Sequence, residues 1–234
     1  MKITLTLRVI AKLLSYPDAD LRRHLPELNE ALCSERALKP GRLAEVQALM
    51  ARLAGHLPLL TEAEYVELFD RGRATSLHLF EHVHGDSRDR GPAMIDLVKT
   101  FEQAGLMLTP GELPDYLPVM LEYASTQPEL VARELLREFT HILLTVFSAL
   151  VKRQSPYASL IAALLELAGE KAQPVALAAE PDIDTSWAEP VVFDGCSTAG
   201  QARPGQPQPI RIVRAPSGAI NPATSPPLTS GARA

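Results

Sequence analysis

The sequence predicts an all-α protein: a single compact bundle of about eight to ten short helices, followed by a disordered C-terminal tail. Three observations predict it. Apolar residues make up 46% of the 234 residues, which is enough for a buried core. Through residues 1–170 they recur at spacings of three and four, and no alternating run is long enough for a strand. We therefore expect a helical domain over 1–170, a partly ordered extension over 171–196 and a disordered tail over 197–234.

The first predicted helices follow from apolar stripes. Ile3, Leu5 and Leu7 alternate, but the pattern then becomes helical. Two later stripes have the spacing of one helix face, at positions 21, 25, 28 and 32 and at positions 43, 46, 50 and 53. Thr61 and Glu64 have the spacing of a capping box, which predicts that a further helix begins there.

The later helices are predicted in the same way. A stripe over 94–101 ends near Gly105, a plausible C-terminal stop. A short helix is expected from Pro114 to Tyr123. Residues 129–150 then carry a long apolar stripe, and Pro156 lies where a last helix could begin.

Charge separates the tail from the rest of the chain. The segment after Cys196 holds four arginines, no acidic residue and seven of the 20 prolines. Such a composition buries too little apolar surface to offset chain entropy, which predicts disorder. The remainder has 19 basic and 28 acidic residues, hence a charge of −9. The total charge of −5 argues against a general nucleic-acid binder.

The same survey predicts a cytoplasmic protein without direct membrane insertion. No stretch reaches the roughly 20 apolar residues that a membrane-spanning helix needs. The N-terminal segment is interrupted by Arg8 and Lys12, and no cleavage site follows. The two cysteines, Cys33 and Cys196, are far apart and form no C-x-x-C pair, which fits a reducing compartment.

One short motif suggests metal chemistry. Residues 78–82 match H-x-x-E-H, and a helix over 76–84 would place His78 and His82 on one face beside Glu81. A catalytic zinc site needs a third protein ligand, for which Glu102 and Glu122 are candidates. The first interpretation is therefore a small zinc hydrolase. The alternative is a charged helical turn whose apolar residues point inward.

A longer run around this motif points elsewhere. The stretch "YVELFDRGRATSLHLFEHVHGDSRDRG", residues 65–91, resembles the NarJ subfamily of the TorD/DmsD-type chaperones. So do "SYPD" at 15–18, "ELPDYLPVMLEY" at 112–123, and Trp187, Phe193 and Cys196. The likeness is collinear over residues 1–196. In this family the position of His78 is often apolar, so the H-x-x-E-H match would be accidental. Where related chaperones often have P-D-H, this chain has Pro114-Asp115-Tyr116.

The resemblance implies a non-enzymatic chaperone without a cofactor of its own. Its expected partner is the catalytic alpha subunit of respiratory nitrate reductase, including the N-terminal leader of that subunit. The chaperone would hold the apo-subunit while the iron–sulfur and molybdenum cofactors are inserted, before the subunit docks at the membrane.

A leader of this kind is a short amphipathic helix with basic residues, so its site should combine an apolar groove with acidic residues at the rim. We expect Asp115 and Glu122 to be exposed there, about two turns apart on one helix. The arginines between 71 and 90 suggest either ion pairs with neighbouring helices or contacts to an anionic cofactor group. The predicted client-binding residues are Phe69, Asp70, Phe80, Glu81, His82, His84, Asp115, Tyr116, Leu117, Glu122 and Tyr123.

Overall fold

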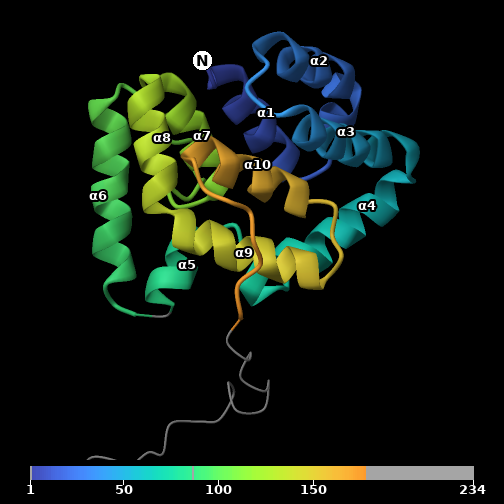
Figure 1. The fold of residues 1–234 in the computed structure, drawn as a ribbon. Helices are drawn as coiled ribbons and strands as arrows, with labels where there is room; N and C mark the ends of the chain where they lie inside the picture. Colours follow the sequence, from blue (N-terminus) through green and yellow to red (C-terminus); the bar gives the residue numbers. More distant parts are fainter. Residues whose placement is uncertain (1, 86, 178–234) are drawn as a thin grey trace, which may run out of the picture. The chain divides into compact units, whose positions relative to one another are not determined.

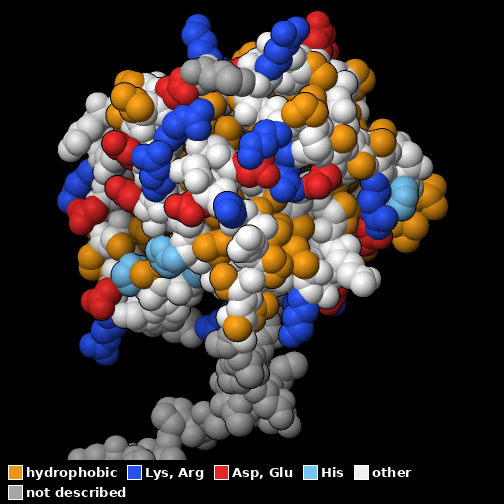
Figure 2. Space-filling view, viewed as in Figure 1, with side chains coloured by type: hydrophobic (Ala, Val, Ile, Leu, Met, Phe, Trp, Pro, Cys, Tyr) orange, Lys and Arg blue, Asp and Glu red, His pale blue; other side chains and the backbone are white. Residues whose placement is uncertain are grey.

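The computed structural model describes residues 2–85 and 87–177. These residues form ten α-helices, one π-helical turn and one 3-10 turn, and their only strand-like pairing is an isolated bridge (Figure 1). The predicted all-α bundle is therefore confirmed. No helix among the described residues is long and apolar enough to cross a membrane. On the face shown in Figure 2, acidic and basic side chains are interspersed and do not form one large patch of a single sign.

Helix α10 (Ala158–Ala168) lies at the centre of the bundle. Nine of its 11 residues are buried, as expected for a helix that is apolar on all sides. It packs against α8 (Glu129–Glu138), α9 (Thr140–Lys152) and α3 (Pro40–Gly55) (Figure 1). Helix α1 (Thr4–Leu14) completes the core, packing against α2 (Ala19–Glu35) and α7 (Leu117–Thr126).

Long-range side chains satisfy several helix ends in this core. Glu35 accepts hydrogen bonds from the N–H groups of Leu5 and Thr6 at the start of α1, at 3.0 and 2.7 Å. Arg137 donates to the carbonyl of Ala168, at the last turn of α10, at 2.9 Å. Because the unpaired groups of a helix end are costly to bury, these contacts fix how the helices meet.

The predicted capping box at Thr61 is wrong. Helix α4 (Pro58–Tyr65) begins three residues earlier, with Leu57 as the N-cap and a proline in the first turn. Thr61 therefore lies inside the helix, and its hydroxyl donates to the Pro58 carbonyl at 2.8 Å. A proline at the start of a helix lacks only an N–H that would have been unpaired, so this start outweighs the later signal.

The chain between α4 and α7 is less regular than the sequence predicts. A π-helical turn (Val66–Asp70) continues α4, and a 3-10 turn (Arg73–Thr75) follows. Then come the short α5 (Leu79–His84) and α6 (Arg90–Gln103). The predicted stop at Gly105 is confirmed by its positive φ of 77°. Helix α6 stands at the edge of the bundle (Figure 1), and Phe101 is its one buried residue.

Three helix boundaries differ from expectation. The helix predicted from Pro114 begins only at Leu117, because residues 115–117 are hydrogen-bonded to the segment before α5. The stripe over 129–150 is two helices, α8 and α9, with a break at Phe139. Helix α10 begins at Ala158, two residues after Pro156. An apolar stripe does not show where a helix is interrupted when both halves bury the same side.

The extension is described only as far as Leu177. Ala172 packs against the core, and the N–H of Val175 donates to the Ser148 hydroxyl at 2.8 Å. The rest of the partly ordered extension predicted over 171–196, and the predicted disorder over 197–234, lie outside the described residues.

Candidate functional site

Two segments that are far apart in the sequence meet beside the core. His78 and Tyr116 form an isolated antiparallel bridge. The Leu79 N–H donates to the Asp115 carbonyl at 2.9 Å, and the Leu117 N–H donates to the Leu77 carbonyl at 2.8 Å. These hydrogen bonds join the segment before α5 to the segment before α7, and so bring together two of the stretches that carry the family resemblance, 65–91 and 112–123.

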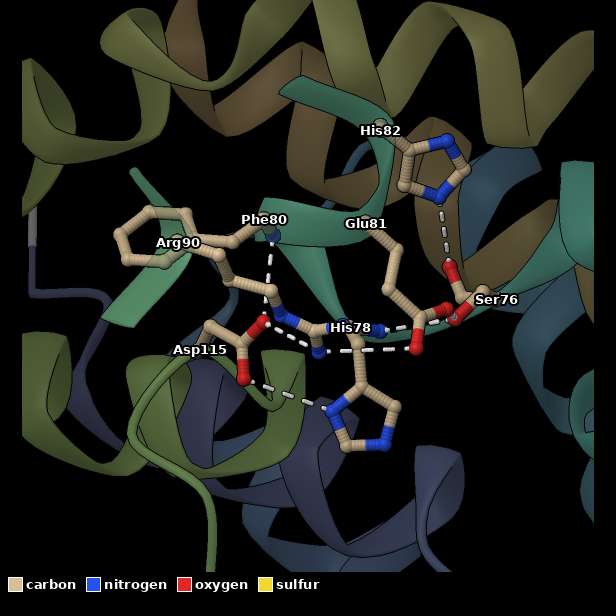
Figure 3. Close-up of polar contacts among 7 residues, drawn as sticks. All are labelled: Ser76, His78, Phe80, Glu81, His82, Arg90 and Asp115. Carbon is tan, nitrogen blue, oxygen red and sulfur yellow. Dashed lines mark hydrogen bonds and ion pairs between the residues drawn. The ribbon is translucent and has the colours of Figure 1, made fainter. Parts of the chain in front are cut away.

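Asp115 is the centre of this junction (Figure 3). Its carboxylate accepts from the Phe80 N–H at 3.2 Å and lies 3.5 Å from both His78 Nδ1 and Arg90 Nη2. The residue is fully buried, so the prediction that Asp115 is an exposed rim charge is wrong. Asp115 also precedes α7 and does not share a helix face with Glu122. A buried carboxylate with several donors holds the segments around it together and is not available to a ligand.

Glu81 and His82 extend the same network (Figure 3). The carboxylate of Glu81 accepts a hydrogen bond from the Ser76 hydroxyl and lies 3.5 Å from Arg90 Nη2. His82 Nε2 is 2.9 Å from the Ser76 carbonyl. Arg90 therefore joins Glu81 to Asp115, which confirms the predicted ion pairs for this arginine.

The helix that the zinc interpretation requires is not formed. His78 lies before α5 in an extended conformation, and its ring is directed at Asp115, whereas His82 is bonded to Ser76. Among the described residues, no group of three or more His, Cys, Asp or Glu side chains is arranged to hold a metal ion. The two histidines do not lie one turn apart on one helix, because the bridge to Tyr116 holds His78 outside α5.

An open cavity of about 470 Å³ lies on one side of this junction. We call it the aromatic cavity. Its lining comes from the segment after α1, the end of α4, the π-helical turn and the two bridged segments. It consists of Tyr16, Tyr65, Phe69, Asp70, Leu77, His78, Gly111, Glu112, Leu113 and Tyr116. The Tyr65 ring packs edge-on against Tyr16, with 5.6 Å between centroids, and tilted against Phe69 at 4.8 Å. The His78 ring lies 5.2 Å from that of Tyr116.

The π-helical turn places Phe69 and Asp70 at this cavity. A π turn holds one more residue than an α turn, so it shifts the side chains that follow it around the helix axis. Phe69 is consequently buried against Tyr65 and Tyr157, while Asp70 is exposed at the mouth. An α-helical continuation of α4 would present a different pair of side chains to the cavity.

Two tyrosine hydroxyls meet at the cavity wall. The Tyr65 hydroxyl donates to the Leu14 carbonyl at 2.8 Å and lies 3.0 Å from the Tyr116 hydroxyl. Burial raises the pKa of both Tyr65 and Tyr116 above the ordinary value for a phenol. Both phenols therefore remain neutral at physiological pH, and they link the end of α1 to the segment before α7.

The remaining predicted residues are divided among other places. Glu122 and Tyr123 line a second cavity of about 530 Å³ between α1, α6 and α7, which shares only Glu112 with the aromatic cavity. Leu117 is buried in the core. Phe80 and His84 pack edge-on against each other on α5, at 5.5 Å.

The structure thus brings Phe69, Asp70 and Tyr116 together in the aromatic cavity. Tyr16, Tyr65 and Glu112 line it as well, although sequence reasoning did not select them as site residues. The signal that could have found them was present, because all three lie within the stretches that carry the family resemblance.

Comparison with known proteins finds a family match that covers the residues lining the aromatic cavity. A family model for the nitrate reductase delta subunit matches residues 16–163. Escherichia coli (strain K12) NarJ, a nitrate reductase molybdenum cofactor assembly chaperone, is 46% identical over 160 residues, which are 68% of each chain. The NarW protein of the same strain is 45% identical over 168 residues, covering 70% of this chain and 68% of NarW.

A more distant solved structure shows the same fold. It belongs to a proposed redox enzyme maturation protein from Archaeoglobus fulgidus. The TM-score is 0.51 at 19% identity, and the match covers 73% of this chain and 96% of that one.

Proposed function

The chain belongs to the nitrate reductase delta subunit family, and on that premise we propose that it is a maturation chaperone that binds the apo form of a nitrate reductase catalytic subunit. The relatives named for molybdenum cofactor assembly support this role. The observation that carries the binding site is the aromatic cavity, whose exposed rings and acidic mouth suit the N-terminal leader of that subunit.

The chemistry of the cavity matches that of an amphipathic leader. Tyr16 is 44% exposed and Tyr116 is half-buried, so their rings are available to a ligand while Phe69 supports them from below. Aromatic rings contribute large contact areas at little cost in side-chain entropy. Asp70 and Glu112 lie exposed at the mouth, where negative charge would speed the encounter with a basic segment.

The role in the cell follows from holding the leader. While the leader occupies the cavity, the subunit is kept from its membrane partner, and the iron–sulfur and molybdenum cofactors have time to be inserted. The chaperone acts in the cytoplasm, leaves the finished enzyme, and performs no catalysis in this proposal. Its contribution is binding free energy alone.

Calorimetric titration with a synthetic leader peptide from the nitrate reductase catalytic subunit of the same genome tests the site. Tyr16→Ala and Tyr116→Ala should each weaken binding by about tenfold or more, since loss of one well-packed aromatic contact costs about 1.4 kcal/mol or more. Tyr123→Ala in the second cavity is the matched control and should change the affinity by less than about twofold.

Thermal unfolding of each variant separates lost binding from lost folding. If Tyr123→Ala weakens binding while the two cavity variants do not, the leader lies between α1, α6 and α7 and our choice of cavity is wrong. If the wild-type chain does not bind the leader at all, the leader-binding role itself is wrong.

A further inference from the structure

The hydrogen bonds at the aromatic cavity have a fixed direction. A carbonyl oxygen can only accept, so the hydroxyl proton of Tyr65 must point at Leu14. A phenol has one proton, and the 3.0 Å contact between the two tyrosines therefore requires Tyr116 to donate to Tyr65. The oxygen of Tyr116 is left with lone pairs and no proton to offer, and no described residue donates to it.

The other polar groups at the cavity are also acceptors. The Tyr16 hydroxyl donates its proton to Glu62 at 3.2 Å, so its oxygen is free to accept. Asp70 and Glu112 contribute two exposed carboxylates, and one oxygen of Glu112 already accepts the Thr109 N–H at 2.9 Å. His78 directs Nδ1 at the buried Asp115. The cavity consequently offers several acceptors and almost no donor to a ligand.

Positive charge near the cavity is already engaged elsewhere. The described lining contains no lysine or arginine. Arg90 lies against Asp115 and Glu81, and Arg71 pairs with Glu67 at 3.1 Å. The carboxylates of Asp70 and Glu112 therefore have no arginine or lysine partner within the lining, and they face a space that is walled by aromatic rings.

Such a space is suited to a cation. The faces of aromatic rings carry negative potential, and a guanidinium or ammonium group within about 6 Å of a ring centroid is attracted to it. An arginine also supplies five donors for the acceptors in the wall. An apolar anchor in the same place would cover the Asp70 carboxylate, the second oxygen of Glu112 and the lone pairs of the hydroxyl oxygens without giving them a donor, which is unfavourable.

We propose that the aromatic cavity is a subsite for one basic side chain of the client leader, held between the rings of Tyr16 and Tyr116 and the carboxylates of Asp70 and Glu112. This inference rests on the proposed function and adds the chemistry of the residue that occupies the site. A cationic anchor would make the leader recognisable by a charge at one position, in addition to its apolar face.

A charge-deletion series in the leader peptide tests this. Each arginine or lysine is replaced singly by citrulline or norleucine, which keep much of the length and remove the charge, and affinities are measured by calorimetry. One position should lose about tenfold or more, whereas the other basic positions should lose about twofold or less, as exposed charges do.

The protein variants identify the partner of that position. In the double variant Asp70→Asn and Glu112→Gln, removing the charge at the sensitive leader position should change the affinity much less than in the wild type. The carboxylates that this charge contacts are gone in that variant. The control pair Glu27→Gln with Glu30→Gln removes the same number of charges from the exposed side of α2 and should leave the sensitivity unchanged. Tyr16→Leu should also reduce the sensitivity, whereas Tyr16→Phe, which keeps the ring, should not.

Two results would overturn the subsite while leaving leader binding intact. The first is equal sensitivity of all basic positions, or a gain in affinity with norleucine, since either means that no cation enters the cavity. The second is a leader position whose charge removal costs the same affinity in the cavity double variant and in the α2 control pair. Failure of the wild-type chain to bind any leader peptide would instead contradict the proposed function on which the subsite rests.

Discussion

Asp115 shows how one residue can belong to a binding motif without facing the ligand. Its carboxylate holds the Phe80 N–H, His78 and Arg90, and its neighbour Tyr116 forms the cavity wall. The sequence identified Asp115 through the family pattern, but an aspartate in a motif is equally consistent with exposure and with burial. Only the meeting of two distant loops decides which of the two occurs.

Changing Asp115 should therefore reduce stability. In Asp115→Asn the amide oxygen can still accept from the Phe80 N–H, but the charge opposite Arg90 is lost. Because Glu81 remains as a partner for Arg90, we expect a cost of about 1–3 kcal/mol, below that of a fully orphaned ion. Urea denaturation measures it.

The matched control is Asp96→Asn on the exposed side of α6, which should change stability by less than about 0.5 kcal/mol. Equal effects of the two substitutions would show that the buried network contributes nothing specific. A loss of leader affinity in Asp115→Asn at unchanged stability would place the carboxylate in the binding site after all.

For the cavity, the sequence does not show which residues far apart in the chain come into contact. Phe69, Asp70 and Tyr116 were selected because they lie in recognisable stretches. The contact of Tyr65 with Tyr116 joins residues 51 positions apart, and no local pattern reports such a pair. The acceptor character of the cavity depends on that contact, so it could not be derived from spacing.

At the level of elements, helices were predictable where one apolar face repeats without interruption, as in α2 and α3. The sequence was a poor guide where backbone geometry departs from the α-helix. The π-helical turn at Val66–Asp70 continues the apolar pattern of α4, and the break at Phe139 leaves its stripe intact. In both places tertiary packing, which local periodicity does not record, sets the backbone.

Gly72 is the residue that closes the turn after the π helix. A Cβ atom at this position would lie 2.2 Å from the Thr75 hydroxyl oxygen and 2.4 Å from the Leu68 carbonyl oxygen. Gly72→Ala should therefore destabilise the chain by about 1–3 kcal/mol through overpacking, and should displace Phe69 and Asp70. Thermal unfolding and leader titration report the two effects.

Gly41 provides the comparison for that substitution. It lies in the first turn of α3, and a Cβ there would meet nothing within 4 Å. Gly41→Ala should be neutral or stabilising by up to about 1 kcal/mol, since alanine is the better helix former. If Gly72→Ala is equally harmless, the contacts of Gly72 with Leu68 and Thr75 relax at no cost and the overpacking prediction is wrong.

For the whole molecule, the buried tyrosines predict how stability depends on pH. Burial raises the pKa of Tyr157 and of Tyr65, so the folded chain retains protons that the unfolded chain releases above a pH of about 10. Stability should fall with rising pH in that range, by up to about 1.4 kcal/mol per pH unit for each such group. Urea denaturation between neutral pH and pH 11 measures the slope.

Tyr157→Phe isolates one of these groups. Its hydroxyl is buried without a hydrogen-bond partner among the described residues, so the substitution should leave stability unchanged or raised at neutral pH. Above pH 10 the variant should become progressively more stable than the wild type. Parallel slopes for the two proteins would mean that other groups cause the alkaline loss.

Domain organisation also belongs to this scale. We propose that the folding unit ends within 171–196 and that residues 197–234 add nothing to its stability. The proposal rests on the composition of that segment, which has no acidic residue and seven prolines.

Helix α6 is expected to open more often than the rest of the bundle. It is attached by Arg90 at one end and by Phe101, stacked on Tyr123, at the other; between them Leu97 packs partly buried against the core, and no other residue of the helix is fully buried. Segments with so little buried surface open on their own, with a smaller free energy than complete unfolding. Its backbone amides should exchange with deuterium long before those of α10. Since Arg90 also contacts Asp115, each opening of the helix would briefly remove one of the contacts that hold the segment before α7.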